Sequence, residues 1–141
     1  MKPRVNVITL AVTDLDKSFE FYNQGLGWES EGIVGKEIEN GAVAFFTLSN
    51  GLTLALWPKD SMQKDAKLNE TSGNYMTNFS LGYNVNSKQE VDEALRTASE
   101  AGGVIVDPAQ DRAWGGYSGY FKDIDGHLWD IVWNPHLIIK E

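Results

Sequence analysis

The chain has 141 residues, 20 acidic and 12 basic side chains, a formal net charge of −8 and no cysteine. Nucleic-acid backbones and anionic lipid surfaces attract cations, so this charge argues against nucleic acid or a membrane as a partner. The lack of cysteine excludes disulfides, zinc–thiolate sites and thiol nucleophiles. No apolar stretch is long enough to span a bilayer, and we therefore expect a cytoplasmic location.

The first half of the chain predicts the element order β-α-β-β-β. A short β-branched run at 5–12 indicates a buried strand, and Asp14 can cap a helix with apolar positions at Leu15, Phe19 and Tyr22. Strands are then expected near 33–38 and, with an Asn-Gly hairpin turn between them, at 42–48 and 52–57.

The second half repeats this plan after a polar connection at 58–76 that has no periodicity. We expect strands at 78–85 and from 104, a hairpin at 119–122 and 128–133, and a helix with a capping box at Ser87 and Glu90. The chain is thus predicted to be one α+β domain over 1–141, with module 1 at about 1–58, a linker at about 59–76 and module 2 at about 77–137.

Strand alternation divides the side chains of four strands between two faces. One face is large and apolar, as a helix-covered face should be, and includes Leu10, Leu54, Trp129 and Ile131. The other face is small and mixed, with residues 7, 9, 11, 53, 55, 57, 78, 80, 82, 128, 130 and 132. Because ligand cavities combine apolar walls with a few polar groups, we predict that this second face lines a pocket for a small molecule.

Two runs carry a family resemblance that spans most of the chain: ITLAVTDLDKSFEFYNQGLGW at 8–28 and GYFKDIDGHLWDIVWNP at 119–135. They resemble the opening and closing motifs of the vicinal oxygen chelate (VOC) superfamily, which includes glyoxalase I, extradiol dioxygenases, and bleomycin- and fosfomycin-resistance proteins. The resemblance implies two βαβββ modules that form an open, curved, eight-stranded mixed sheet, the glyoxalase/bleomycin resistance-like fold. It also implies a homodimer with the ligand inside.

Enzymes of this superfamily hold a divalent metal with four strand residues, which the resemblance places at Val7, Ala55, Asn78 and Asp130. Only Asp130 is a strong ligand, and one carboxylate with one amide replaces the hydration shell of a divalent ion poorly. We therefore predict no metal site and no cofactor, although a divalent metal stays a disfavoured alternative. The histidines are interpreted as surface residues, and the acidic segment 123–126 as a β-turn.

Asp130 is the most informative site candidate, because an unpaired carboxylate in an apolar strand costs several kcal/mol to bury, roughly. It should have a partner or a raised pKa, and it could bind ligand, act as a base, or only hydrogen-bond to Asn78, Ser80 or the backbone. Trp114 and Tyr120 could stack on a planar ligand or pack across a dimer interface. Arg112 could pair with an anionic ligand or a nearby aspartate. The predicted ligand-binding set is Trp57, Asn78, Ser80, Trp114, Tyr120 and Asp130, with Asp130 also the candidate catalytic residue.

Three functional hypotheses follow. The main one is a metal-independent glyoxalase/bleomycin resistance-like protein that binds a small, partly aromatic molecule between its modules. The alternative is an enzyme, either a lyase or isomerase or a ring-cleaving dioxygenase, in which Asp130 acts as base or metal ligand. The third is a non-catalytic domain whose aromatic residues serve dimerisation. Whether the chain is an enzyme is left open by the sequence.

Overall fold

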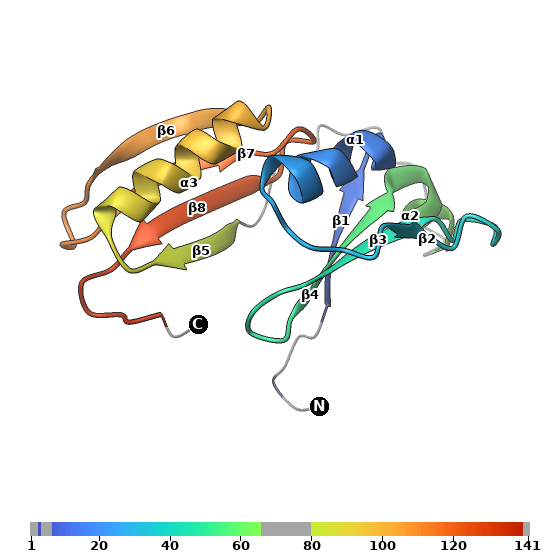
Figure 1. Cartoon of the computed structure of the whole chain (residues 1–141), viewed down its shortest axis with the longest axis horizontal. Helices are drawn as coiled ribbons and strands as arrows, with labels where there is room; N and C mark the ends of the chain where they lie inside the picture. Colours follow the sequence, from blue (N-terminus) through green and yellow to red (C-terminus); the bar gives the residue numbers. More distant parts are fainter. Residues whose placement is uncertain (1–2, 4–6, 66–79, 140–141) are drawn as a thin grey trace. The chain divides into compact units, whose positions relative to one another are not determined.

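The computed structural model describes residues 3, 7–65 and 80–139, and it divides the chain into two compact units, Met1–Asn74 and Tyr75–Glu141 (Figure 1). Each unit contains a four-stranded mixed sheet and its own helices. This is the α+β class and the repeated βαβββ order that the sequence predicts. No helix in the described part of the chain is both long and apolar enough to cross a membrane.

The first unit has a sheet of order β1-β4-β3-β2, in which β1 runs parallel to β4 and the other pairs are antiparallel. The Asp14 side chain accepts a hydrogen bond from the Lys17 backbone N–H at 3.0 Å, which confirms the predicted cap. The elements are β1 Val7–Val12, α1 Leu15–Glu20, the π-helical turn η1 Phe21–Gly25, β2 Ile33–Val34, β3 Val43–Thr47, β4 Thr53–Pro58 and α2 Lys59–Asp65.

The core of the first unit contains an aromatic cluster centred on Phe46 of β3. The Phe46 ring centroid lies 5.8 Å from that of Phe19, 5.9 Å from that of Tyr22 and 6.2 Å from that of Trp28. Phe46 and Tyr22 are both fully buried, whereas Phe45, the next residue on the opposite face of β3, is 46% exposed. The strand alternation thus separates a packed face from an open one.

The second unit has a sheet of order β5-β8-β7-β6, with β5 parallel to β8. Ser87 Oγ accepts a hydrogen bond from the Glu90 N–H at 3.2 Å, so Ser87 caps the helix as predicted. The Glu90 carboxylate reaches back to the N–H of Asn86, one residue before the cap. The elements are β5 Leu81–Val85, α3 Lys88–Glu100, β6 Val104–Asp111, β7 Tyr117–Lys122 and β8 Leu128–Trp133.

Helix α3 lies along one face of this sheet (Figure 1) and buries Val91, Leu95 and Ala98 against it. On the sheet side, Trp129 and Ile131 are buried, and the Trp129 ring stacks on Phe121 at 5.9 Å. These residues lie on the helix-covered face, as the alternation predicts. The same prediction is only partly right for β5, where Tyr83 is 44% exposed because β5 is an edge strand and α3 packs mainly over its neighbours.

The turn between β7 and β8 is organised by the buried carboxylate of Asp123. Asp123 Oδ1 accepts hydrogen bonds from the N–H groups of Asp125 at 3.0 Å and His127 at 2.9 Å. Its Oδ2 lies 2.7 Å from His127 Nδ1. The segment is therefore a turn, as predicted, but His127 is largely buried against this carboxylate rather than placed on the surface.

Replacing Asp123 by alanine should lower the free energy of unfolding by about 2 kcal/mol, because backbone N–H groups beside a buried carboxylate lose their acceptor. Asp123→Asn is the matched control, since its amide oxygen can still accept both backbone bonds. Denaturant unfolding measures both variants. Equal losses for alanine and asparagine would contradict this role of the backbone hydrogen bonds.

Candidate functional site

The side of the second unit's sheet that faces away from α3 is here called the open face. Ser118 and Tyr120 of β7 lie on it, paired across the ladder with Val132 and Asp130 of β8. Gly119, between them, points toward the helix, since a Cβ built there would lie 2.7 Å from Leu95 Cδ1. Strand alternation therefore places Tyr120 and Asp130 side by side on the open face.

Strand β6 brings further polar groups to this face through an irregular ladder. Its register against β7 shifts between Ile105 and Asp107 and again between Asp107 and Gln110. β6 approaches β7 so closely that a Cβ on Gly119 would lie 2.9 Å from both the backbone carbonyl oxygen of Asp107 and the backbone nitrogen of Ala109. β-bulges of this kind re-aim side chains, and here Asp107 stands opposite Tyr120.

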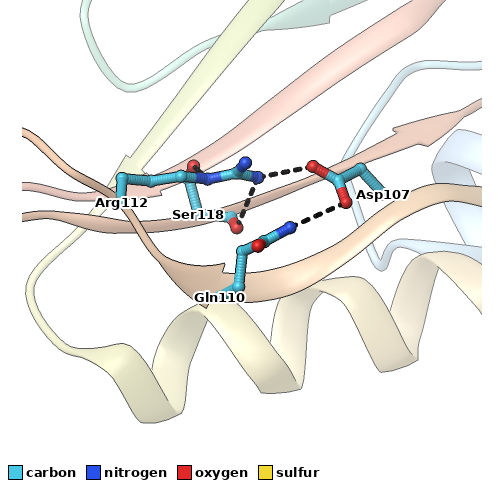
Figure 2. Close-up of polar contacts among 4 residues, drawn as sticks. All are labelled: Asp107, Gln110, Arg112 and Ser118. Atoms are coloured by element: carbon cyan, nitrogen blue, oxygen red, sulfur yellow. Dashed lines mark hydrogen bonds and ion pairs between the residues drawn. The ribbon is translucent and has the colours of Figure 1, made fainter.

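The Arg112 guanidinium group bonds to Asp107 of β6 and Ser118 of β7, beside the irregular part of the ladder (Figure 2). Its Nη2 donates to Asp107 Oδ2 at 2.8 Å and to the Ser118 carbonyl at 3.0 Å, and its Nε donates to Ser118 Oγ at 2.8 Å. Gln110 Nε2 donates to the other Asp107 oxygen at 2.9 Å. Charge-assisted bonds from two sides of a planar group fix its orientation.

Tyr120 links this network to Asp130. The guanidinium carbon of Arg112 lies 6.0 Å from the Tyr120 ring centroid, and Tyr120 is the cross-strand neighbour of Asp130 on β7 and β8. Burial raises the pKa of Asp130, although the nearby Tyr120 hydroxyl and the Arg112 charge act in the opposite direction. The negative charge of Asp130 is in turn the main cause of a raised pKa at Tyr120.

Asp130 keeps one oxygen without a partner. Among the described residues, no donor bonds to Oδ1, although this atom is inaccessible to solvent. Of the predicted partners, Ser80 is exposed just before β5 and does not bond to this oxygen, and Asn78 lies outside the described residues. The sequence predicts that a buried carboxylate at this position needs a partner, and the structure places Tyr120 beside it.

The other predicted site residues lie elsewhere. Trp57 belongs to β4 of the first unit, where its Nε1 donates to the Asn40 carbonyl at 2.8 Å. Trp114 is 54% exposed in the turn between β6 and β7, with its ring folded over Gly116. The structure therefore brings together Tyr120 and Asp130 from the predicted set. Asp107 and Ser118 lie in the same group, and sequence reasoning missed both. The available signal was Asp107, a charged residue that follows three apolar residues at the start of β6.

Two of the four positions that the resemblance assigns to a divalent ion have side chains without a ligand atom. Val7 and Ala55 lie on β1 and β4 and have hydrocarbon side chains, which offer no donor atom. That leaves Asp130 as the one strong ligand at the positions that the structure describes. A separate group at 123, 125 and 127 has ligand atoms within 4.8 Å of one another, but Asp123 and His127 are bonded to each other there.

Comparisons with known proteins agree with this architecture. The sequence matches the Glyoxalase/Bleomycin resistance protein/Dioxygenase superfamily over residues 4–131. A glyoxalase-related enzyme from Fulvimarina pelagi is 34% identical, with a TM-score of 0.81 and coverage of 99% of this chain and 94% of that one. No functionally curated protein matches the sequence significantly.

More distant solved structures share the fold alone. A glyoxalase/bleomycin resistance protein/dioxygenase from Nocardioides is 22% identical, with a TM-score of 0.70 and coverage of 100% and 89%. A mutant of the fosfomycin resistance protein FosX from Listeria monocytogenes, complexed with Mn(II) and 1S,2S-dihydroxypropylphosphonic acid, is 23% identical, with a TM-score of 0.65 and coverage of 93% and 90%. The chain belongs to the glyoxalase/bleomycin resistance protein/dioxygenase superfamily, the vicinal oxygen chelate superfamily that its two terminal motifs resemble.

Proposed function

We propose that the open face of the second unit binds a small, partly aromatic molecule at Tyr120 and Asp130, without a resident divalent metal. The observation that carries this proposal is the Asp130 carboxylate, which is partly buried and has an oxygen that accepts no hydrogen bond among the described residues. A desolvated acceptor without a donor is costly, so a ligand that supplies a donor gains that free energy on binding.

The surroundings of Asp130 suit a planar ligand. Tyr120 offers an aromatic ring next to the carboxylate, and aromatic pairs gain about 1 kcal/mol beyond the area that they bury. The Arg112 guanidinium is held by Asp107 and Ser118 on one side of this ring, so little side-chain entropy remains to be lost on binding. Rigid polar groups beside an aromatic ring are typical of small-molecule sites.

The hydrocarbon side chains of Val7 and Ala55 support binding without a metal. We expect protein dialysed against EDTA to bind indole and phenol with unchanged affinity. Elemental analysis of protein purified without added metal is the direct check. Stoichiometric nickel, zinc, manganese or iron that EDTA removes together with binding would overturn the metal-independent part of the proposal.

The binding test is a titration with indole and phenol, followed by the backbone amide signals of 15N-labelled protein. Saturable shifts should cluster on β7 and β8 around Tyr120 and Asp130. Asp130→Ala and Tyr120→Phe should each weaken binding about 10-fold, equivalent to about 1.4 kcal/mol. The matched control is Tyr117→Phe, which removes a hydroxyl from the same strand but on the helix side, where it bonds to Asp92.

Two results would contradict the proposal: shifts that cluster away from the open face, or equal weakening in Tyr117→Phe and Tyr120→Phe. The first would remove Asp130 from the site. The second would show that any change in β7 disturbs binding, so that the Tyr120 hydroxyl has no specific part in it.

A second candidate is an enzyme in which Asp130 accepts a proton from carbon. The observation that favours it is that burial raises the pKa of Asp130, and that Tyr120 is its cross-strand neighbour. Acetophenone in D2O is a suitable probe, because removal of a methyl proton and return of a deuteron changes only the isotope. If the wild type catalyses this hydrogen–deuterium exchange and Asp130→Asn does not, the site is catalytic and the binding-only proposal is replaced.

A further inference from the structure

We infer that the ligand of the open face carries a cationic N–H group, an amidinium or an ammonium, that is held between the Asp130 carboxylate and the Tyr120 ring. This inference rests on the proposed function and names the chemical class of its ligand. It follows from which groups on the open face are already paired and which are left over.

The surplus group at this site is an acceptor. Asp130 lies beside Tyr120 across the β7–β8 ladder, and its Oδ1 accepts no hydrogen bond among the described residues. The terminal torsion of an aspartate is broad, so rotation about it can bring Oδ1 toward a ligand. A carboxylate has room for about four hydrogen bonds and can only accept them, so the missing partner must be a donor.

The cation at the site is already committed. Arg112 bonds to Asp107 and Ser118 through Nε and Nη2, and these two charged side chains are largely shielded, with 22% of the Arg112 and 35% of the Asp107 side chain exposed. Asp107 is thus the charge partner of Arg112, and Asp107 and Asp130 together place two negative charges beside the one positive charge of Arg112. Lys122 also alternates onto this face, but it is exposed at the end of β7 and is not among the charges that act on Asp130.

The Tyr120 ring favours the same ligand class. The face of an aromatic ring attracts cations, and the Arg112 guanidinium already lies over this one at 6.0 Å from its centroid. A second cation between the ring and Asp130 would gain both the ring and the carboxylate as partners. An anionic ligand would face Asp130 at close range, and among the described residues the cation nearest to Tyr120, Arg112, is already paired with Asp107.

The test uses three probes of nearly identical size: benzamidine, which is cationic and a donor, benzamide, which is neutral, and benzoate, which is anionic and only accepts. Each is titrated into 15N-labelled full-length protein at constant ionic strength. We expect benzamidine to bind at least 10-fold more tightly than benzoate, with benzamide between them and with shifts centred on Tyr120 and Asp130.

Asp130→Asn should reverse this order. The asparagine side chain has no charge and presents an N–H2 donor in place of one carboxylate oxygen, so benzoate should gain affinity while benzamidine loses at least 10-fold. Glu93→Gln is the charge-matched control, because it removes one negative charge from α3 on the other side of the sheet. It should leave the order of the three probes unchanged.

The outcomes separate this inference from the function on which it rests. If benzoate or benzamide binds to the wild type at the open face as tightly as benzamidine, the inference is overturned and the binding site stands. If Glu93→Gln changes the order as much as Asp130→Asn does, the preference comes from overall charge and the inference is again overturned. If none of the probes shifts the signals around Tyr120 and Asp130, both the inference and the proposed function fail.

Discussion

Replacing Phe46 by alanine should destabilise the first unit by about 4 kcal/mol, since truncating a buried aromatic residue loses its transfer free energy and leaves a cavity. Phe46 is 1% exposed, and its ring lies within 6.2 Å of the rings of Phe19, Tyr22 and Trp28. Those three residues come from α1, η1 and the segment after it, so the loss affects the contact between helix and sheet.

Phe45→Ala is the matched control, because it removes the same atoms from the next position of the same strand. Phe45 is 46% exposed and faces away from the cluster, so its loss should cost less than about 1 kcal/mol. Guanidinium unfolding followed by near-UV circular dichroism measures both variants. A similar loss of stability in the two variants would mean that the exposed side of β3 contributes as much to packing as the buried side.

Much of this organisation could be predicted because strand alternation and helix capping are local signals. Asp14 and Ser87 cap their helices, and Trp129 and Ile131 lie under α3 while Asp130 does not. Each of these outcomes depends on residues only a few positions apart, so the periodicity of the sequence contains the information.

Other features could not be predicted, because they depend on contacts between distant residues. The π-helical turn η1 follows α1 without any sequence signal that we recognised, and α2 begins in a polar stretch without apolar periodicity. The register shifts of β6 are set by its approach to Gly119, and the pairing of Arg112 with Asp107 and Ser118 depends on those shifts. From the sequence alone, Arg112 could pair either with an anionic ligand or with a nearby aspartate.

Gly119→Ala should destabilise the second unit by about 3 kcal/mol, the upper range for overpacking, because two of the atoms in the way belong to the backbone. The added Cβ would lie 2.9 Å from the backbone oxygen of Asp107 and from the backbone nitrogen of Ala109, and 2.7 Å from Leu95 Cδ1. A side chain can rotate away, but β6 can retreat only by loosening the irregular ladder that holds Asp107 opposite Tyr120. Ligand binding at the open face should therefore weaken together with stability.

Gly82→Ala separates steric conflict from the general effect of adding a methyl group to a strand of this sheet. Gly82 lies on β5 opposite Asp130, with no atom within 4 Å of the position that its Cβ would take, so this variant should be neutral or more stable by about 0.5 kcal/mol. Combining Gly119→Ala with Leu95→Ala decides which contact matters. Because the backbone conflict persists in the double variant, stability should not return; a recovery to the level of Leu95→Ala alone would place the conflict at Leu95 and leave β6 free of it.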